Sequence, residues 1–280
     1  MLRVARWRKS GVARCRVREH RERGCRPYLV VGEPLWSEEG VFVAGTDVAQ
    51  ERSTMSEDVY RRIREAIVTG ELRPGERIRD YELAEDLGTS KAPIRHALGR
   101  LAEEGLIEMQ RNRFTRVAPL DPDRIRDALA VYGDIWKGSV RHAMPAIQAD
   151  DITYLVDLTD DMAVAVRERD VAAFGGALRA IAVGFARIEG NGIRVSTIEV
   201  LAPQIRRFTP RAQGVFDWVA SESATTDIRE AILQRDADQA RAAIVVLFDD
   251  VLPRVVDRAE ELAHASEDSA EETRRADDRG

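Results

Sequence analysis

The chain has 280 residues, of which 44% are hydrophobic and 33% charged, with a net charge of −6. This composition excludes a collagen, a low-complexity tract and a wholly disordered protein, and the length suffices for two domains with separate cores. No uncharged apolar run reaches the ~18 residues of a membrane span, and the first residues do not form a signal peptide. We therefore expect a cytoplasmic protein with no membrane partner.

The charge is unevenly distributed along the chain. Residues 1–54 carry a net charge of +4, residues 55–120 are neutral, and residues 121–280 carry −10. Since nucleic acid repels acidic surfaces, any DNA contact must come from residues before Leu120.

Residues 1–54 show no sustained helical or strand period and are rich in arginine up to Arg26. Three interpretations remain open: a basic arm that grips phosphates, a targeting peptide, or a chain whose true translation starts later, for instance at Met55. The cysteines Cys15 and Cys25 lie in this stretch and form neither a CxxC pair nor a disulfide framework. We predict that residues 1–54 are either a disordered extension or a stretch upstream of the true translation start.

From Met55 the elements become clear. Ser56 is the predicted N-cap of an amphipathic helix that runs to Gly70, and a short strand is expected at 76–79 after the Pro-Gly turn. Asp80 is the predicted cap of a second helix, which ends at Gly88.

A third helix follows a tight turn. Ser90 is its predicted N-cap, Pro93 is tolerated in its first turn, and Gly105 ends it. Two short strands are expected at 106–109 and 115–117. Helix, strand, helix, turn, helix and hairpin within residues 55–120 is the layout of a winged helix-turn-helix domain.

The stretch AIVTGELRPGERIRDYELAEDLGTSKAPIRHALGRLAEEGLIEMQRNRFTRV also resembles the GntR family of bacterial transcriptional regulators. The resemblance implies binding to double-stranded DNA at a pseudo-palindromic operator, by a homodimer. It places DNA contacts on the start of the third helix and on the wing, at Ser90, Lys91, Ala92, Arg95, Asn112 and Arg113. The chain departs from the family pattern at Lys91-Ala92, usually Arg-Thr, at His96, usually Glu, and at Phe114, usually a wing glycine.

Residues 121–264 read as helices only, because apolar residues recur at three and four spacing with few Gly or Pro breaks. We predict an all-helical effector-binding and dimerisation domain, whereas residues 265–280 should be a disordered tail. The fold class is mainly α. The approximate predicted helices are 123–147, 150–168, 170–189, 193–206, 211–234 and 237–264.

Segments such as RDVAAFGGAL and DIREAILQRDADQARAAI are similar to the FCD type of ligand-sensing domain. Many members hold a divalent metal with one Asp and three His, a suitable ligand set for zinc or nickel. The matching positions here are Leu178, Ala182, Thr225 and Leu247, which cannot ligate through a carboxylate or imidazole. We predict no metal and no cofactor.

The resemblance still implies an effector pocket, and the residues at its positions are mostly apolar. The predicted pocket residues are Tyr132, Trp136, Leu178, Ala182, Thr225, Arg229 and Leu247. These side chains either line an apolar cavity or simply fill it as a solid core. Arg179, Arg206, Arg207 and Arg229 are candidate anchors for an acidic effector, although such residues are usually solvated.

The usual short catalytic signatures are absent, so we expect no enzyme. The predicted function is a sequence-specific transcriptional regulator, more specifically a repressor, controlled by a small-molecule effector. The alternatives are a constitutive regulator with a collapsed pocket and a winged-helix module that binds proteins.

Overall fold

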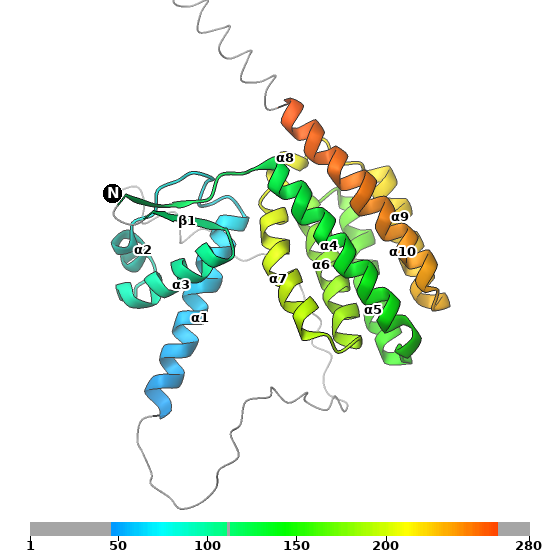
Figure 1. Cartoon of the computed structure of the whole chain (residues 1–280), viewed down its shortest axis with the longest axis horizontal. Helices are drawn as coiled ribbons and strands as arrows, with labels where there is room; N and C mark the ends of the chain where they lie inside the picture. The colour runs from blue at the N-terminus through cyan, green and yellow to red at the C-terminus, as the bar shows by residue number, and fades with distance from the viewer. Residues whose placement is uncertain (1–45, 111–112, 263–280) are drawn as a thin grey trace, which may run out of the picture.

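A computed structural model of the protein describes residues 46–110 and 113–262, with side-chain packing from Met55 onward. Figure 1 shows a small head that contains the first helices and strands, beside a larger bundle of helices. Each has its own hydrophobic cluster, one formed by residues between Val59 and Val117 and the other by residues between Ile125 and Ala259.

The head is built on three helices and a hairpin. These elements are α1 (Thr46–Val68), α2 (Asp80–Asp86), α3 (Lys91–Glu103), β1 (Ile107–Gln110) and β2 (Phe114–Val117). The apolar face of α3, with Ile94, Leu98 and Leu101, is buried against α1. The two strands are antiparallel, and the expected strand at 76–79 forms a single bridge between Arg77 and Arg116 at the free edge of β2.

Two helix starts differ from the sequence-based prediction. The predicted N-cap Ser56 lies inside α1, because the chain has no Gly or Pro between Gly45 and Gly70 to stop the helix, which begins at Thr46. The boundary predicted after residue 54 therefore falls within a helix. Asp80 is the first residue of α2 rather than its cap, a position that Arg79 occupies. Ser90 occupies the N-cap position of α3, as predicted, although its side chain makes no capping hydrogen bond.

The bundle consists of helices throughout. Its elements are α4 (Pro122–Ala143), η1 (Met144–Ala146), α5 (Ala149–Glu168), α6 (Val171–Ile188), α7 (Gly192–Arg206), α8 (Thr209–Ala212), α9 (Trp218–Gln234), α10 (Ala237–Val245) and η2 (Val246–Val251). Helix α6 packs against α4, α5 and α7 and has nine buried residues. Within the described residues it is the one helix long and apolar enough to cross a membrane, and half of it is buried inside the protein.

Two predicted helices of the bundle have a different form. The segment 211–234 is divided into α8 and α9, because the chain turns at 213–217 around Gly214 and Asp217 restarts the helix by accepting a hydrogen bond from the Ala220 amide. The last helix continues to residue 262 but contains the π-helical turn η2. The predicted extension before residue 46 and the predicted tail at 265–280 lie outside the described residues.

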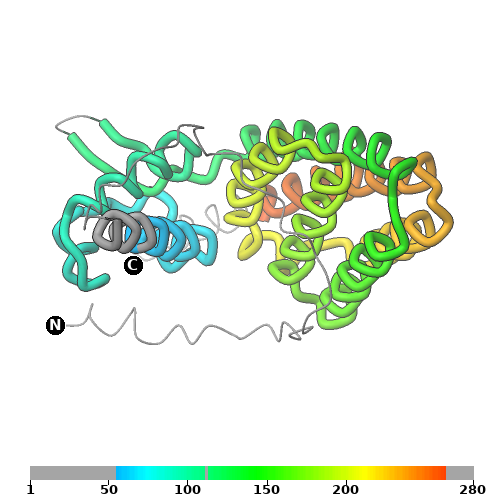
Figure 2. Tube along the Cα trace, turned by 90° about the horizontal axis from the view of Figure 1, so that it is seen from below, coloured from blue at the N-terminus to red at the C-terminus, as the bar shows by residue number. Residues whose placement is uncertain are grey.

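The head and the bundle meet along α7, which Figure 2 shows at the end of the bundle that faces the head. The Gln204 amide donates to the Glu104 carbonyl at 2.8 Å, and Arg64 of α1 donates to the Glu199 carbonyl at 2.5 Å. Arg207 donates to the carbonyl of Ala118 in the connecting segment. We call this contact region the seam; it is polar, and α7 supplies most of the bundle side.

Candidate DNA interface and effector cavity

The N-terminal end of α3 presents an exposed face on the head. Ser90, Lys91, Ala92 and Arg95 are all exposed, whereas the opposite side of the helix is buried. The Ser90 side chain makes no capping hydrogen bond. Backbone amides at a helix N-terminus, with Lys and Arg beside them, suit phosphates and base edges. The structure therefore brings together the four residues predicted on α3.

Arg95 has a partner in the head itself. Its Nε donates to the Asp80 carboxylate at 2.8 Å, although 70% of the Arg95 side chain is exposed. This bond holds the pKa of Asp80 below its usual range. Because the bond that Asp80 accepts comes from Nε, the two terminal nitrogens are left as donors for a bidentate contact to guanine.

The wing is only partly described. Asn112 lies outside the described residues, and Arg113 is exposed in the turn, where its amide donates to the Gln110 carbonyl at 2.9 Å. Phe114 opens β2, and the Arg116 guanidinium lies 4.7 Å from the centre of its ring. An aromatic side chain packed under an arginine thus occupies the position where the family pattern has glycine.

Within the ranges 46–110 and 113–262, no group of three or more His, Cys, Asp and Glu side chains is placed to hold a metal ion. The four positions that match the family's metal ligands, Leu178, Ala182, Thr225 and Leu247, are all buried in the bundle. The Thr225 hydroxyl donates to the Ser221 carbonyl at 2.7 Å, which satisfies it within α9. These residues form part of the hydrophobic core instead of a polar site.

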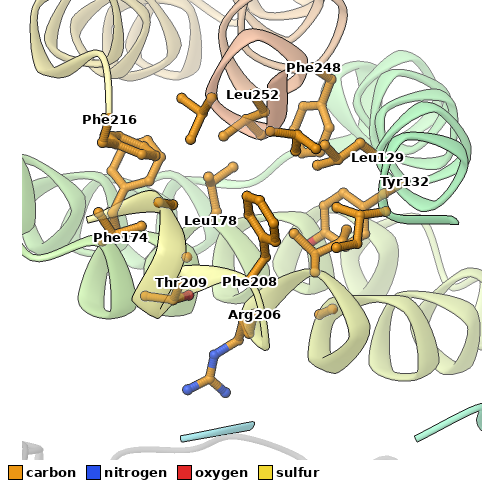
Figure 3. A pocket seen from close by; sticks show the side chains of 18 residues that line it. Leu129, Tyr132, Phe174, Leu178, Arg206, Phe208, Thr209, Phe216, Phe248 and Leu252 are labelled. Atoms are coloured by element: carbon orange, nitrogen blue, oxygen red, sulfur yellow. The ribbon is translucent and has the colours of Figure 1, made fainter. Parts of the chain in front are cut away.

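An apolar cavity lies between α4, α6, α7, α8 and the last helix. Its free volume is about 80 Å³, several times the space that one water molecule needs, and it has an open mouth. Figure 3 shows Phe174, Phe208, Phe216 and Phe248 around it. The lining is Ile125, Leu129, Tyr132, Val171, Phe174, Gly175, Leu178, Ala202, Ile205, Arg206, Phe208, Thr209, Ala212, Phe216, Phe248, Leu252, Val255 and Val256.

Of the predicted pocket residues, Tyr132 and Leu178 line this cavity. The others lie elsewhere: Ala182, Thr225 and Leu247 are buried in the core, and Trp136 packs edge-on against Phe248 at 5.8 Å between ring centres. Arg229 pairs with Asp160 at 2.8 Å on the side of the bundle, and so it does not anchor anything in the cavity. The cavity lies nearer to α7 and α8 than the sequence suggests.

The polar end of the cavity faces the seam. Burial raises the pKa of the Tyr132 hydroxyl, and the nearest charges that act on it are Arg179 and Glu199. Arg179 pairs with Glu199 at 2.5 Å. The backbone carbonyl of Glu199 in turn accepts the hydrogen bond from Arg64 of α1 described above, so that the Arg179–Glu199 pair, whose charges act on Tyr132, is in contact with the head.

The turn from α7 into α8 sends three consecutive side chains in three directions. Phe208 enters the cavity, Arg207 reaches the Ala118 carbonyl, and Arg206 lies beside α1, with 3.9 Å between its Nη2 and the Glu65 carboxylate. Burial lowers the pKa of Arg207 to about 10 and also lowers that of Arg206. From the sequence both arginines are only surface candidates for an anchor, because no periodicity distinguishes them from solvated residues.

Comparison with known proteins supplies two family matches. Residues 55–117 match the model of the bacterial regulatory proteins of the gntR family, and residues 127–250 match the FCD domain. An uncharacterized HTH-type transcriptional regulator in an unstable DNA locus of Streptomyces ambofaciens is 29% identical over 71% of this chain and 85% of that protein.

A further sequence match covers a quarter of the chain, and a structural match covers most of it. The HTH-type transcriptional regulator Mce2R of Mycobacterium tuberculosis is 39% identical over 24% of this chain and 28% of its own length. The solved structure of E. coli McbR/YncC has a TM-score of 0.56 at 16% identity and covers 76% of this chain and 98% of that one. At this identity the structural likeness concerns the fold.

Proposed function

We propose that this chain, which belongs to the GntR family of bacterial regulatory proteins and is a DNA-binding transcriptional regulator with an FCD domain, is a homodimeric repressor released by a small apolar effector. It is not an enzyme. The observation that carries the proposal is the apolar cavity at the junction of α7 and α8, directly behind the seam with the head. We infer the cytoplasm as its compartment, since its target is chromosomal DNA.

DNA reading would use the exposed start of α3. Lys91 at the helix N-terminus suits a phosphate, and Arg95, braced by Asp80, suits a guanine in the major groove. Two heads in a dimer would read two half-sites of an inverted repeat. The residue-level assignment of Ser90, Lys91, Ala92, Arg95, Asn112 and Arg113 is part of this proposal.

Effector control requires that the ligand bind two states of the protein with different affinity. The cavity supports such control because its walls include α7 and the turn that follows it, which are also the bundle's contacts with the head. Tyr132 and Leu178 are the two predicted pocket residues that face this space. A ligand that reshapes the wall there changes the seam at the same time.

The experiment that tests the proposal begins with the full chain and sheared genomic DNA of the source organism. DNA retained by the protein is sequenced and searched for a short inverted repeat, and the genes beside it suggest candidate metabolites. A metabolite that raises the melting temperature and lowers operator affinity supports the repressor; sharp sites with no responsive metabolite indicate a constitutive regulator. Retention no better than bulk DNA, by a folded dimer, contradicts the assigned DNA contacts.

A further inference from the structure

We propose that the effector is an apolar molecule with a single anionic end, and that Arg206 couples it to the head by exchanging Glu65 for that anion. The proposal rests on the effector function proposed above and adds the chemical class of the ligand and the residue that transmits its binding. It depends on one guanidinium that belongs both to the wall of the cavity and to the seam.

The residues that line the cavity determine the polarity and the charge of a ligand that fits there. Among the 18 lining residues of the described chain, Arg206 is the one charged side chain, and Tyr132 and Thr209 are the two with hydroxyl groups. An apolar body buries its surface here at no cost in unpaired polar groups, whereas a ligand charged at both ends would leave one charge without a partner.

Arg206 is poorly satisfied where it stands. Its Nε is buried and has no hydrogen-bond partner, and its contact with Glu65 is long at 3.9 Å. Burial disfavours its charged form, which is the direction that an additional anion would reverse. Figure 3 shows the guanidinium pointing away from the aromatic side chains, so Nε, next to the stem, is its nitrogen closest to the cavity. An anion bound at this end of the cavity therefore lies nearest to the unsatisfied atom.

The neighbouring arginines do not line the cavity, although the Nε atoms of Arg64 and Arg207 are also buried without a hydrogen-bond partner. Arg179 holds the Glu199 carboxylate at 2.5 Å, and Arg64 donates to the Glu199 carbonyl at 2.5 Å. Glu65, by contrast, is 60% exposed and loses little when its partner leaves, because water replaces the guanidinium. Arg64 and Glu199 form an equally long ion pair across the seam, at 3.9 Å, but Arg206 is the arginine of these pairs that also lines the cavity.

Exchange of the anionic partner of Arg206 links the cavity to the DNA-binding head. Glu65 belongs to α1, which packs along α3, so its release removes one of the contacts that hold the head against α7. The anion and Glu65 compete for the same guanidinium, and thermodynamic reciprocity makes each weaken the other. The remaining contacts, at Gln204 and Arg207, keep the head attached, so the coupling is modest in size.

The test compares octanoate with 1-octanol, which have the same apolar chain and differ in the anion. Calorimetry on the full chain should show octanoate binding about tenfold more tightly than octanol, the gain expected of a charge-assisted hydrogen bond. Arg206→Met should remove this difference, while the matched control Arg187→Met, an exposed arginine at the end of α6, should keep it.

The variant Glu65→Gln tests the coupling and does not depend on the folding of the cavity variant. It should tighten octanoate by about threefold and leave octanol unchanged, because the competitor is gone. Octanoate should lower operator affinity about threefold in the wild type and in the control Glu103→Gln, an exposed acid of α3, but not in Glu65→Gln.

The outcomes separate the two proposals. Equal affinity for octanoate and octanol in the wild type keeps the cavity as a ligand site and overturns the role of Arg206. Octanoate affinity that is unchanged by Glu65→Gln overturns the exchange of partners. If neither compound binds to the wild type, the apolar effector site fails, and with it the inference that rests on it.

Discussion

The brace between Asp80 and Arg95 should determine how strictly the protein discriminates its operator. Arg95→Ala removes a bidentate base contact and should cost about 1–3 kcal/mol on the operator, or about 5- to 150-fold in affinity. Asp80→Asn leaves the arginine but loosens its side chain, since the charge-assisted bond from Nε at 2.8 Å becomes at most a weaker, neutral one. Ordering an arginine costs up to ~2 kcal/mol, and with 70% of the side chain exposed we expect a part of this, about 0.5–1 kcal/mol.

The assay is fluorescence anisotropy with the operator and a scrambled duplex, and the quantity of interest is the ratio of the two affinities. Asp80→Asn should lower this ratio about two- to fivefold, and binding to the scrambled duplex should rise slightly because an acid near the phosphates is removed. Glu85→Gln removes an exposed acid from the same helix and should change the ratio little.

A double-mutant cycle decides whether the brace acts through Arg95. In the Arg95→Ala background, Asp80→Asn should no longer change the ratio, since the side chain that it orients is gone. The melting temperature should be nearly the same in all variants, because an exposed ion pair contributes about 0–1 kcal/mol to stability. If Asp80→Asn lowers the ratio equally in both backgrounds, the brace is refuted.

Three other predictions concern the phosphate contact, the helix crossing and the cavity. Lys91→Ala should weaken operator and scrambled DNA alike and reduce the salt dependence of binding by about one ion, measured by a salt titration; selective loss on the operator would contradict the phosphate role. Gly133→Ala places a methyl group 2.8 Å from Cβ of Phe248 and should destabilise by about 1–2 kcal/mol in thermal denaturation, whereas Gly176→Ala, with nothing within 4 Å, should stabilise slightly. Leu178→Phe should fill the cavity and abolish octanoate binding with little change in melting temperature; retained binding would place the ligand elsewhere.

The head could be predicted closely from its sequence because the residues that begin and end its helices act locally. Gly88 and Gly105 each end a helix through a left-handed backbone conformation that depends on a few neighbouring residues, and Ser90 stands at the N-cap position of α3. The start of α1 was missed for the same reason: Ser56 resembles a cap, yet nothing before it interrupts the helix.

The site was harder to predict, because its geometry depends on residues far apart in the chain. Asp80 and Arg95 meet across two helices, and neither residue type reveals this pairing. The cavity depends on Phe208 and Phe216, in and after the turn that divides the predicted helix 211–234 from α7. Family resemblance placed the pocket around Trp136 and Leu247, which are packed solid here, because Phe248 stands against Tyr132 and Trp136.

The turn that carries Arg206, Arg207 and Phe208 brings the wall of the cavity very close to the contacts between the bundle and the head. Three side chains are attached here to neighbouring Cα atoms about 3.8 Å apart: one lines the cavity, one bonds to the connecting segment, and one faces α1. Because planar peptide groups join them, displacement of the phenylalanine ring by a rigid shift of this turn carries both arginines with it. If the proposed effector binds in the cavity, its signal therefore reaches the head through one turn, without a series of intermediate residues through the bundle.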